Sequence, residues 1–400
     1  MDGLRPCQNR AKCTPLLNIL RSYYFVIFGA LGLYLPYFPA WLEAQGFAGA
    51  PMSIMMMLSP LLSLISPPLT GMLADSLGLR GKLASFASLL TSSGMLALAA
   101  VASHPGPVSV RTAFTCMCAF ALFRAPISGL ADVLAMEHRA QYGRIRLWGS
   151  LGFLVTSLAG GAVLDPSARV AVPLAIGLWF LAASVIARFL PQTSEQAPRP
   201  ALSDARLLVS RPSYRRLLGT SLLIYASYSC YDMLLSLRLR DLGASPALVG
   251  AYWALATVSE VGLLFLGASI LRRIEPSRLL ALSLLVAAMR WILVAEITSL
   301  PILLLLQPLH AITFGLMWIS LMALLRRECA GLGMATAQGL QSAAISLGAA
   351  GGLFGWGILY HSAGSKVAFE LAALLALLSA WSAGGLVESG ETTADASATS

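Results

Sequence analysis

Residues 142–153 read YGRIRLWGSLGF and join a basic segment directly to an apolar, glycine-spaced segment that continues to about residue 164. Arg144 and Arg146 are two positions apart, so they point to different faces of a helix. Arg144 lies at the expected membrane surface, as a hydrated loop cation or a functional residue. Arg146 lies further into the apolar segment, where an arginine is rare unless it lines a cavity or has a partner. The stretch therefore predicts a membrane-spanning helix with a functional arginine.

The composition places the whole chain in a membrane. Of its 400 residues, 57% are hydrophobic and 11% are charged, with a mean hydropathy of +0.76, whereas a soluble domain carries about 25% charged residues. The formal charge of +9 lies in short loops between apolar runs, as the positive-inside rule predicts. The charge therefore does not indicate nucleic acid as a partner. The six cysteines show no metal-ligand spacing, so we expect free thiols and no metal site.

Apolar runs of about 20 residues recur along the chain, and each can cross a ~30 Å hydrocarbon core. The expected spans are 17–42, 51–73, 82–103, 111–134, 144–164 and 170–190, followed by 215–238, 247–270, 277–297, 301–325, 334–359 and 366–387. A weak repeat relates the two sets, which is typical of transporters whose halves rock about a central site. The sequence predicts an all-α integral membrane protein with twelve transmembrane helices in two six-helix pseudo-symmetric bundles.

The domain boundaries follow from these spans. We expect an N-terminal bundle over 1–192, a polar linker over 193–214 with room for a surface helix, a C-terminal bundle over 215–387 and a disordered tail over 388–400. The basic loops all fall on one side of the membrane. Both termini and the linker are therefore predicted to be cytoplasmic, in a multi-pass protein of a bacterial inner (plasma) membrane surrounded by lipid.

Ionisable residues within the spans are functional candidates by default. Arg124 and Asp132 are eight residues apart in one span, so an uninterrupted helix would place them on one face. Arg124 either pairs with Asp132 or another acid, or binds an anionic substrate. Asp232, Glu260, Arg290 and His310 are each expected at similar depth on four consecutive helices of the second half. Burial disfavours the charged form of an isolated carboxylate, so this set predicts a proton-coupling site.

The opening stretch resembles the start of the fifth helix in the major facilitator superfamily, in the branch of lactose permease, nucleoside:proton symporters and 3-phenylpropionate permease. In that branch the second arginine of an Arg-x-Arg pair lines the substrate site, which implies this role for Arg146. Asp75 stands in a loop similar to the superfamily's Gly-x-x-x-Asp-x-x-Gly signature. A gating role is therefore expected for Asp75, and we group Asp132 and Arg144 with it as gating candidates.

The same branch couples protons to substrate through an acid in helix eight, an arginine in helix nine and a histidine in helix ten. Glu260, Arg290 and His310 match those positions. Gln307 stands where lactose permease has a lysine, which weakens the case for a sugar substrate. The resemblance leaves open whether Glu260, His310 or Asp232 carries the proton.

Aromatic side chains complete the expected substrate site. The candidates for substrate binding are Tyr24, Phe28, Arg124, Arg146, Trp148, Tyr228, Arg290 and Trp318. No HExxH or GxSxG motif is present, so we do not expect an enzyme. The sequence and the resemblance predict a monomeric secondary transporter that uses a proton gradient and no cofactor to import a small organic solute. An aromatic or carboxylated compound such as 3-phenylpropionate is favoured; nucleoside or sugar symport and proton-coupled efflux are the alternatives.

Overall fold

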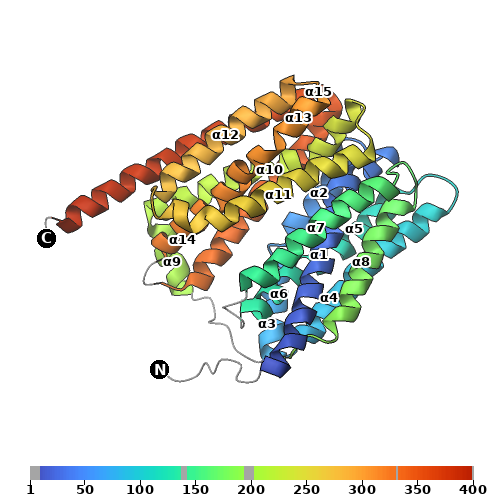
Figure 1. Ribbon diagram of the computed structural model, residues 1–400, viewed down its shortest axis with the longest axis horizontal. Helices are drawn as coiled ribbons and strands as arrows, with labels where there is room; N and C mark the ends of the chain where they lie inside the picture. The colour runs from blue at the N-terminus through green and yellow to red at the C-terminus, as the bar shows by residue number, and fades with distance from the viewer. Residues whose placement is uncertain (1–9, 137–141, 193–201, 330–331, 399–400) are drawn as a thin grey trace.

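The computed structural model describes residues 10–136, 142–192, 202–329 and 332–398. These residues fold into two helical bundles that lie side by side (Figure 1). The first bundle contains α1 (Arg10–Ala44), α2 (Ala50–Leu62), α3 (Ser66–Leu77), α4 (Arg80–Ser103), α5 (Val110–Arg124), α6 (Ile127–Met136), α7 (Tyr142–Val163) and α8 (Ala171–Ala187). The all-α membrane fold is confirmed.

The second bundle follows a short surface helix, α9 (Leu202–Ser210). It contains α10 (Pro212–Asp241), α11 (Pro246–Leu271), α12 (Pro276–Glu296), α13 (Leu300–Leu305), η2 (Gln307–Leu309), η3 (Ala311–Leu316), α14 (Met317–Glu328) and α15 (Met334–Ala398). Asp204 of α9 accepts a hydrogen bond from the Gly333 amide at 2.9 Å, so the linker helix docks beside the start of α15. Residues 193–201 of the expected linker lie outside the described residues.

Within the described residues, eight helical runs are long and apolar enough to cross a membrane. One of them, Met334–Leu386, is long enough for the last two expected spans, and it changes direction at Gly364, where φ is 85°. With α7, α8 and α10, the arrangement is consistent with twelve spans. The helix continues to Ala398, so the structure differs from the disordered tail expected over 388–400. Extending an existing helix needs no new nucleus, and the alanines and glutamates of this segment favour helix.

Two spans of the first bundle are interrupted next to each other. Pro126 has no amide hydrogen to donate to the Leu122 carbonyl, and α5 ends just before it at Arg124. That carbonyl instead accepts from the Ser66 hydroxyl at 2.5 Å, at the start of α3. The carbonyl left without a helical donor at the break between α5 and α6 is thus paired with a hydroxyl at the break between α2 and α3. It also interrupts the helical stripe expected to join Arg124 and Asp132, and no contact between these two residues is present in the described structure.

The two bundles meet tightly at the end where α1, α7 and α10 finish. A Cβ atom on Gly161 of α7 would lie 2.8 Å from the Cα of Ala247 in α11, so only glycine allows this approach. Ser53 of α2 is fully buried and lies against Gly357 of α15. We call this end of the molecule the closed end. Toward α6 and α14 the two bundles diverge (Figure 1).

Side chains from both bundles bond across the closed end. Glu43 of α1 forms an ion pair with Arg240 of α10, with 2.6 Å between Oε2 and Nη2. The Tyr360 hydroxyl of α15 donates to Asp241 at 2.9 Å and also reaches Glu43 at 3.4 Å. We call Glu43, Arg240, Asp241 and Tyr360 the inter-half lock. The contacts that Glu43 makes with Arg240 and Tyr360 must break if the halves separate at this end.

Candidate functional site

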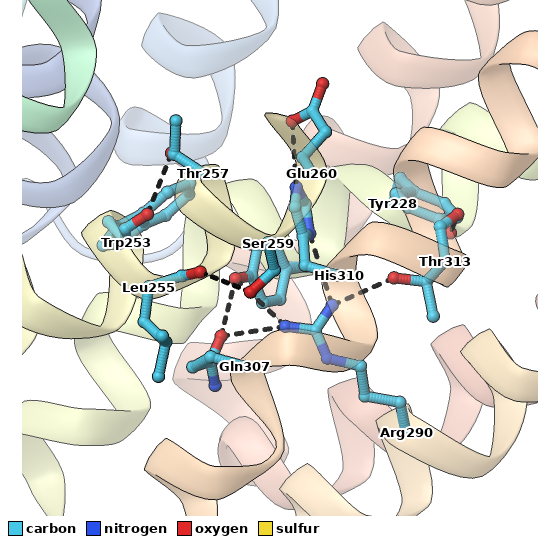
Figure 2. A network of polar contacts seen from close by, with 11 residues as sticks. Tyr228, Trp253, Leu255, Thr257, Ser259, Glu260, Arg290, Gln307, His310 and Thr313 are labelled. Atoms are coloured by element: carbon cyan, nitrogen blue, oxygen red, sulfur yellow. Dashed lines mark hydrogen bonds and ion pairs between the residues drawn. The ribbon is translucent and has the colours of Figure 1, made fainter. Parts of the chain in front are cut away.

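Arg290 of α12 is fully buried and is surrounded by hydrogen-bond acceptors (Figure 2). Its Nη2 donates to the Gln307 side-chain oxygen at 2.8 Å and to the Tyr231 hydroxyl at 3.2 Å. Its Nη1 donates to the Thr313 hydroxyl at 3.1 Å and lies 3.3 Å from His310 Nδ1. The guanidinium carbon also stands 4.6 Å from the Tyr231 ring centre. A buried cation is tolerated only when it is bonded in this way.

The tenth span turns irregular where it faces Arg290. A 3₁₀ segment, η2, begins at Gln307, and a π segment, η3, follows from Ala311. Pro308 cannot donate an amide hydrogen, so one helical hydrogen bond is missing at this point, which favours an irregular turn. Gln307 donates to the Leu303 carbonyl at 3.0 Å, which fixes its oxygen toward the arginine. The irregular turns allow Gln307, His310 and Thr313 to point at one guanidinium, and π segments are often found at functional sites.

His310 links the arginine to a carboxylate. Because a guanidinium can only donate, His310 Nδ1 must accept from Arg290, and the proton of the neutral ring is therefore on Nε2. The Nε2–H group faces Glu260 Oε2 at 3.8 Å, which is too long for a hydrogen bond but makes the two groups direct neighbours (Figure 2). The Glu260 side chain is 25% exposed. Arg290, His310 and Glu260 therefore form a chain from a buried cation to an accessible acid.

Aromatic rings hold the imidazole in place. His310 stacks on Phe314 with 5.3 Å between ring centres and on Tyr231 with 5.6 Å. The Tyr228 hydroxyl donates to the Thr313 carbonyl. Tyr231, which was not a predicted site residue, thus contacts both the arginine and the histidine. In the sequence, the feature that could have identified Tyr231 as a site residue was its position next to Asp232 and three residues after Tyr228.

A second polar cluster lies in the first bundle, where α1, α6 and α7 meet. Asp132 accepts from the Tyr24 hydroxyl at 2.5 Å and from the Tyr142 hydroxyl at 3.2 Å. Arg146 Nη1 lies 3.4 Å from the same carboxylate oxygen. The Arg146 guanidinium also stands 5.6 Å from the Phe28 ring centre, and Phe28 stacks on Tyr24. The structure therefore joins Tyr24, Phe28 and Arg146 to Asp132, which was expected only as a gating residue.

The two clusters face the same boundary between the halves. Arg146 and Glu260 are near enough to attract each other electrostatically, although they belong to different bundles. Phe153 of α7 and Trp253 of α11 also meet there, with 6.1 Å between ring centres. The Arg146 side chain is 46% exposed, so it is accessible to a ligand.

Other predicted residues lie outside these clusters. Trp148 contacts Phe25 edge to face, with 6.4 Å between ring centres, because it is two positions from Arg146 and points elsewhere. Trp318 is half-buried in α14, and Arg144 is exposed at the start of α7. Asp75 belongs to α3, but its side chain is not among the described ones.

Asp232 and Arg124 stand apart from both clusters. Asp232 is half-buried in α10 and has no hydrogen bond or ion pair to the part of the chain that the structure describes. Arg124 contacts the Phe120 ring, with 6.0 Å from its guanidinium carbon to the ring centre. Its buried Nε has no hydrogen-bond partner in the described structure.

Comparisons with known proteins agree with this architecture. The model of the MFS_1-like family matches residues 17–371. A maltose permease of Geobacillus stearothermophilus is 29% identical over 282 residues, covering 69% of this chain and 70% of the permease. A probable 3-phenylpropionic acid transporter of Escherichia coli K12 is 28% identical over 306 residues, covering 73% and 77%.

Solved structures show the same fold. The nucleoside transporter NupG superimposes with a TM-score of 0.76 at 15% identity, over 93% of this chain and 99% of NupG. The human organic anion transporter MFSD10 superimposes with a TM-score of 0.63 at 19% identity, over 94% and 100%. At these identities the likeness concerns the fold alone.

Proposed function

The chain belongs to the MFS_1-like family, and from this premise we propose that it is a proton-coupled symporter of a small organic solute, with an aromatic carboxylate favoured. Family membership makes it a multi-pass membrane transporter of a small molecule. The coupling to protons, the substrate class, the monomeric state and the orientation in a bacterial inner membrane are our proposals. In that orientation both termini face the cytoplasm, the closed end faces outward, and the described conformation opens inward.

The chain of Arg290, His310 and Glu260 is the observation that carries the proposal. Arg290 donates a hydrogen bond to His310 Nδ1. His310 therefore cannot become doubly protonated without losing that contact. We therefore assign the transported proton to Glu260. Its side chain is accessible, and its surroundings determine whether the carboxyl group is ionised or neutral.

Arg146 supplies the change in surroundings that coupling requires. In the described conformation burial disfavours the charge of Glu260, and the attraction of Arg146 across the boundary between the halves opposes this effect. When the halves move so that Arg146 and Glu260 lie further apart, this attraction falls and the ionised form is less stabilised, so Glu260 takes up a proton. A substrate that binds between the halves then moves together with the proton.

The substrate class rests on charge and on one relative. The predicted substrate site contains three arginines, Arg124, Arg146 and Arg290, which favours an anion. The relative from E. coli is named for 3-phenylpropionic acid, a carboxylate with an aromatic ring. The relative named for maltose and the structure named for nucleosides make neutral substrates the alternative.

The test is Glu260→Gln, which mimics the permanently protonated acid. We expect the purified variant in liposomes to bind 3-phenylpropionate and to exchange it across the membrane. Accumulation against a gradient should be lost, because no proton is released. Glu370→Gln removes a carboxylate that pairs with Lys366 away from the site, and it should accumulate substrate like the wild type. Normal accumulation by Glu260→Gln would show that Glu260 is not the coupling residue and would move the test to Asp232.

A further inference from the structure

The three arginines predicted to bind substrate, Arg124, Arg146 and Arg290, differ in what they contact. Arg290 donates to Gln307, Tyr231 and Thr313, and Arg146 lies beside the Asp132 carboxylate. Arg124 has neither a carboxylate nor a hydrogen-bond acceptor among the described residues. The contacts of its guanidinium are the Phe120 ring and an electrostatic interaction with Tyr34.

Arg124 points into the bundle and not toward lipid. The buried positions of α5 are Ala113, Met117, Phe120 and Ala121. Arg124 continues that face, three and four residues after the last two. Its Nε atom is buried without a partner, while the side chain as a whole is half-buried. The cation is therefore held inside the bundle with part of its surface accessible.

Further polar groups gather beside this guanidinium. The Tyr34 ring lies 5.2 Å from the Phe120 ring, centre to centre, and its hydroxyl has only the weak acceptor Met56 Sδ at 3.7 Å. Ser59 lies near the Tyr34 hydroxyl, and its own buried hydroxyl has no hydrogen-bond partner in the described structure. The break between α5 and α6 directly follows Arg124. The Arg124 guanidinium is thus near enough to the Tyr34 hydroxyl to interact with it electrostatically, and its own buried Nε has no acceptor among the described residues.

Such an arrangement is costly unless an anion completes it. A guanidinium stays protonated in proteins, and an arginine at the centre of a membrane helix costs about 2.5–3.5 kcal/mol even on insertion scales. Its planar fork matches a carboxylate, which can accept two parallel hydrogen bonds from it. Arg290 and Arg146 already have partners, so they are less available for this role.

We propose that Arg124 is the subsite that binds the carboxylate of the transported substrate, with the Tyr34 and Ser59 hydroxyls as additional donors. This inference rests on the proposed transport function and specifies its substrate as an organic monocarboxylate. It also assigns different tasks to the arginines: Arg124 binds the carboxylate, Arg146 contacts another part of the substrate and interacts with Glu260, and Arg290 orients His310.

The test compares 3-phenylpropionate with its neutral amide, 3-phenylpropanamide, in equilibrium binding to purified protein in lipid nanodiscs. The wild type should bind the acid at least about tenfold more tightly than the amide, which is about 1.4 kcal/mol. Arg124→Gln should bind both alike at the wild-type affinity for the amide, and this retained affinity shows that the variant is folded. Arg124→Lys should keep part of the preference, because the charge remains without the fork. Arg111→Gln changes an exposed arginine near the start of the same helix and should behave like the wild type.

Two results would overturn the inference. An Arg124→Gln variant that still prefers the acid tenfold places the anion site elsewhere and leaves the symport proposal standing. A wild type that binds acid and amide equally refutes both the subsite and the carboxylate as substrate class. Proton coupling itself is tested separately by Glu260→Gln, so the two proposals fail independently.

Discussion

Opening of the closed end should become easier when the inter-half lock loses its charge. Glu43→Gln keeps the size of the side chain but removes the carboxylate that Arg240 contacts at 2.6 Å. A Coulomb estimate at an effective dielectric constant of about 20 gives about 6 kcal/mol at this distance. The side chains of Arg240 and Glu43 are 39% and 25% exposed, so solvent screens much of this energy. Arg240 also keeps Asp241. We expect a net loss of about 1 kcal/mol, or a shift of about fivefold toward the open state.

Cysteine labelling measures this shift. Ser53→Cys is a near-isosteric change at a fully buried position of the closed end, introduced after the six native cysteines are replaced. The rate of reaction with an impermeant maleimide then reports the population in which this end is open. Glu43→Gln should raise the rate about fivefold.

Glu296→Gln is the matched control, because it breaks an ion pair of 2.8 Å with Lys366 that lies wholly within the second half. The labelling rate should not change. An unchanged rate in Glu43→Gln, or an equal rise in Glu296→Gln, would refute the view that the lock holds the two halves together.

Three further predictions test other parts of the account. Arg146→Lys keeps the charge but loses the planar fork, so substrate binding should weaken at least about tenfold in equilibrium binding; binding within about twofold of the wild type would make Arg146 structural. Gly161→Leu places a side chain where even a Cβ lies 2.8 Å from the Ala247 Cα, so uptake should stop and labelling at Ser53→Cys should become fast, whereas slow labelling would contradict the tight approach. Tags at both termini and in the 191–214 linker should be protected from external reagents, and an external linker would contradict the proposed topology.

The spans predicted from hydropathy are consistent with the described helices, but hydropathy could not place the interruptions. Pro126 marks one break in the sequence, since it removes the donor for the Leu122 carbonyl. That the missing donor is replaced by Ser66, from a neighbouring span, depends on a contact between segments far apart in the chain. The stripe expected for Arg124 and Asp132 was wrong for the same reason, because it assumed an unbroken helix.

The site was partly predictable from helical spacing. Glu260, Arg290 and His310 were identified as charged or titratable residues at similar depth, and the structure brings them into one chain. Tyr231 was missed because a tyrosine in an apolar helix is usually a packing residue, and only the position of Arg290 reveals its hydroxyl contact. Asp132 acquired its place beside Arg146 through the packing of α6 against α7, which local sequence does not determine.

Proton movement with the substrate tests the central claim most directly. Liposomes containing the protein and an internal pH dye receive external 3-phenylpropionate with no other ion gradient, and protein-free liposomes correct for permeation of the neutral acid. We predict acidification of the lumen above that background, in step with substrate uptake, and no such excess for Glu260→Gln. Protein-dependent uptake of the substrate without proton entry would contradict proton-coupled symport.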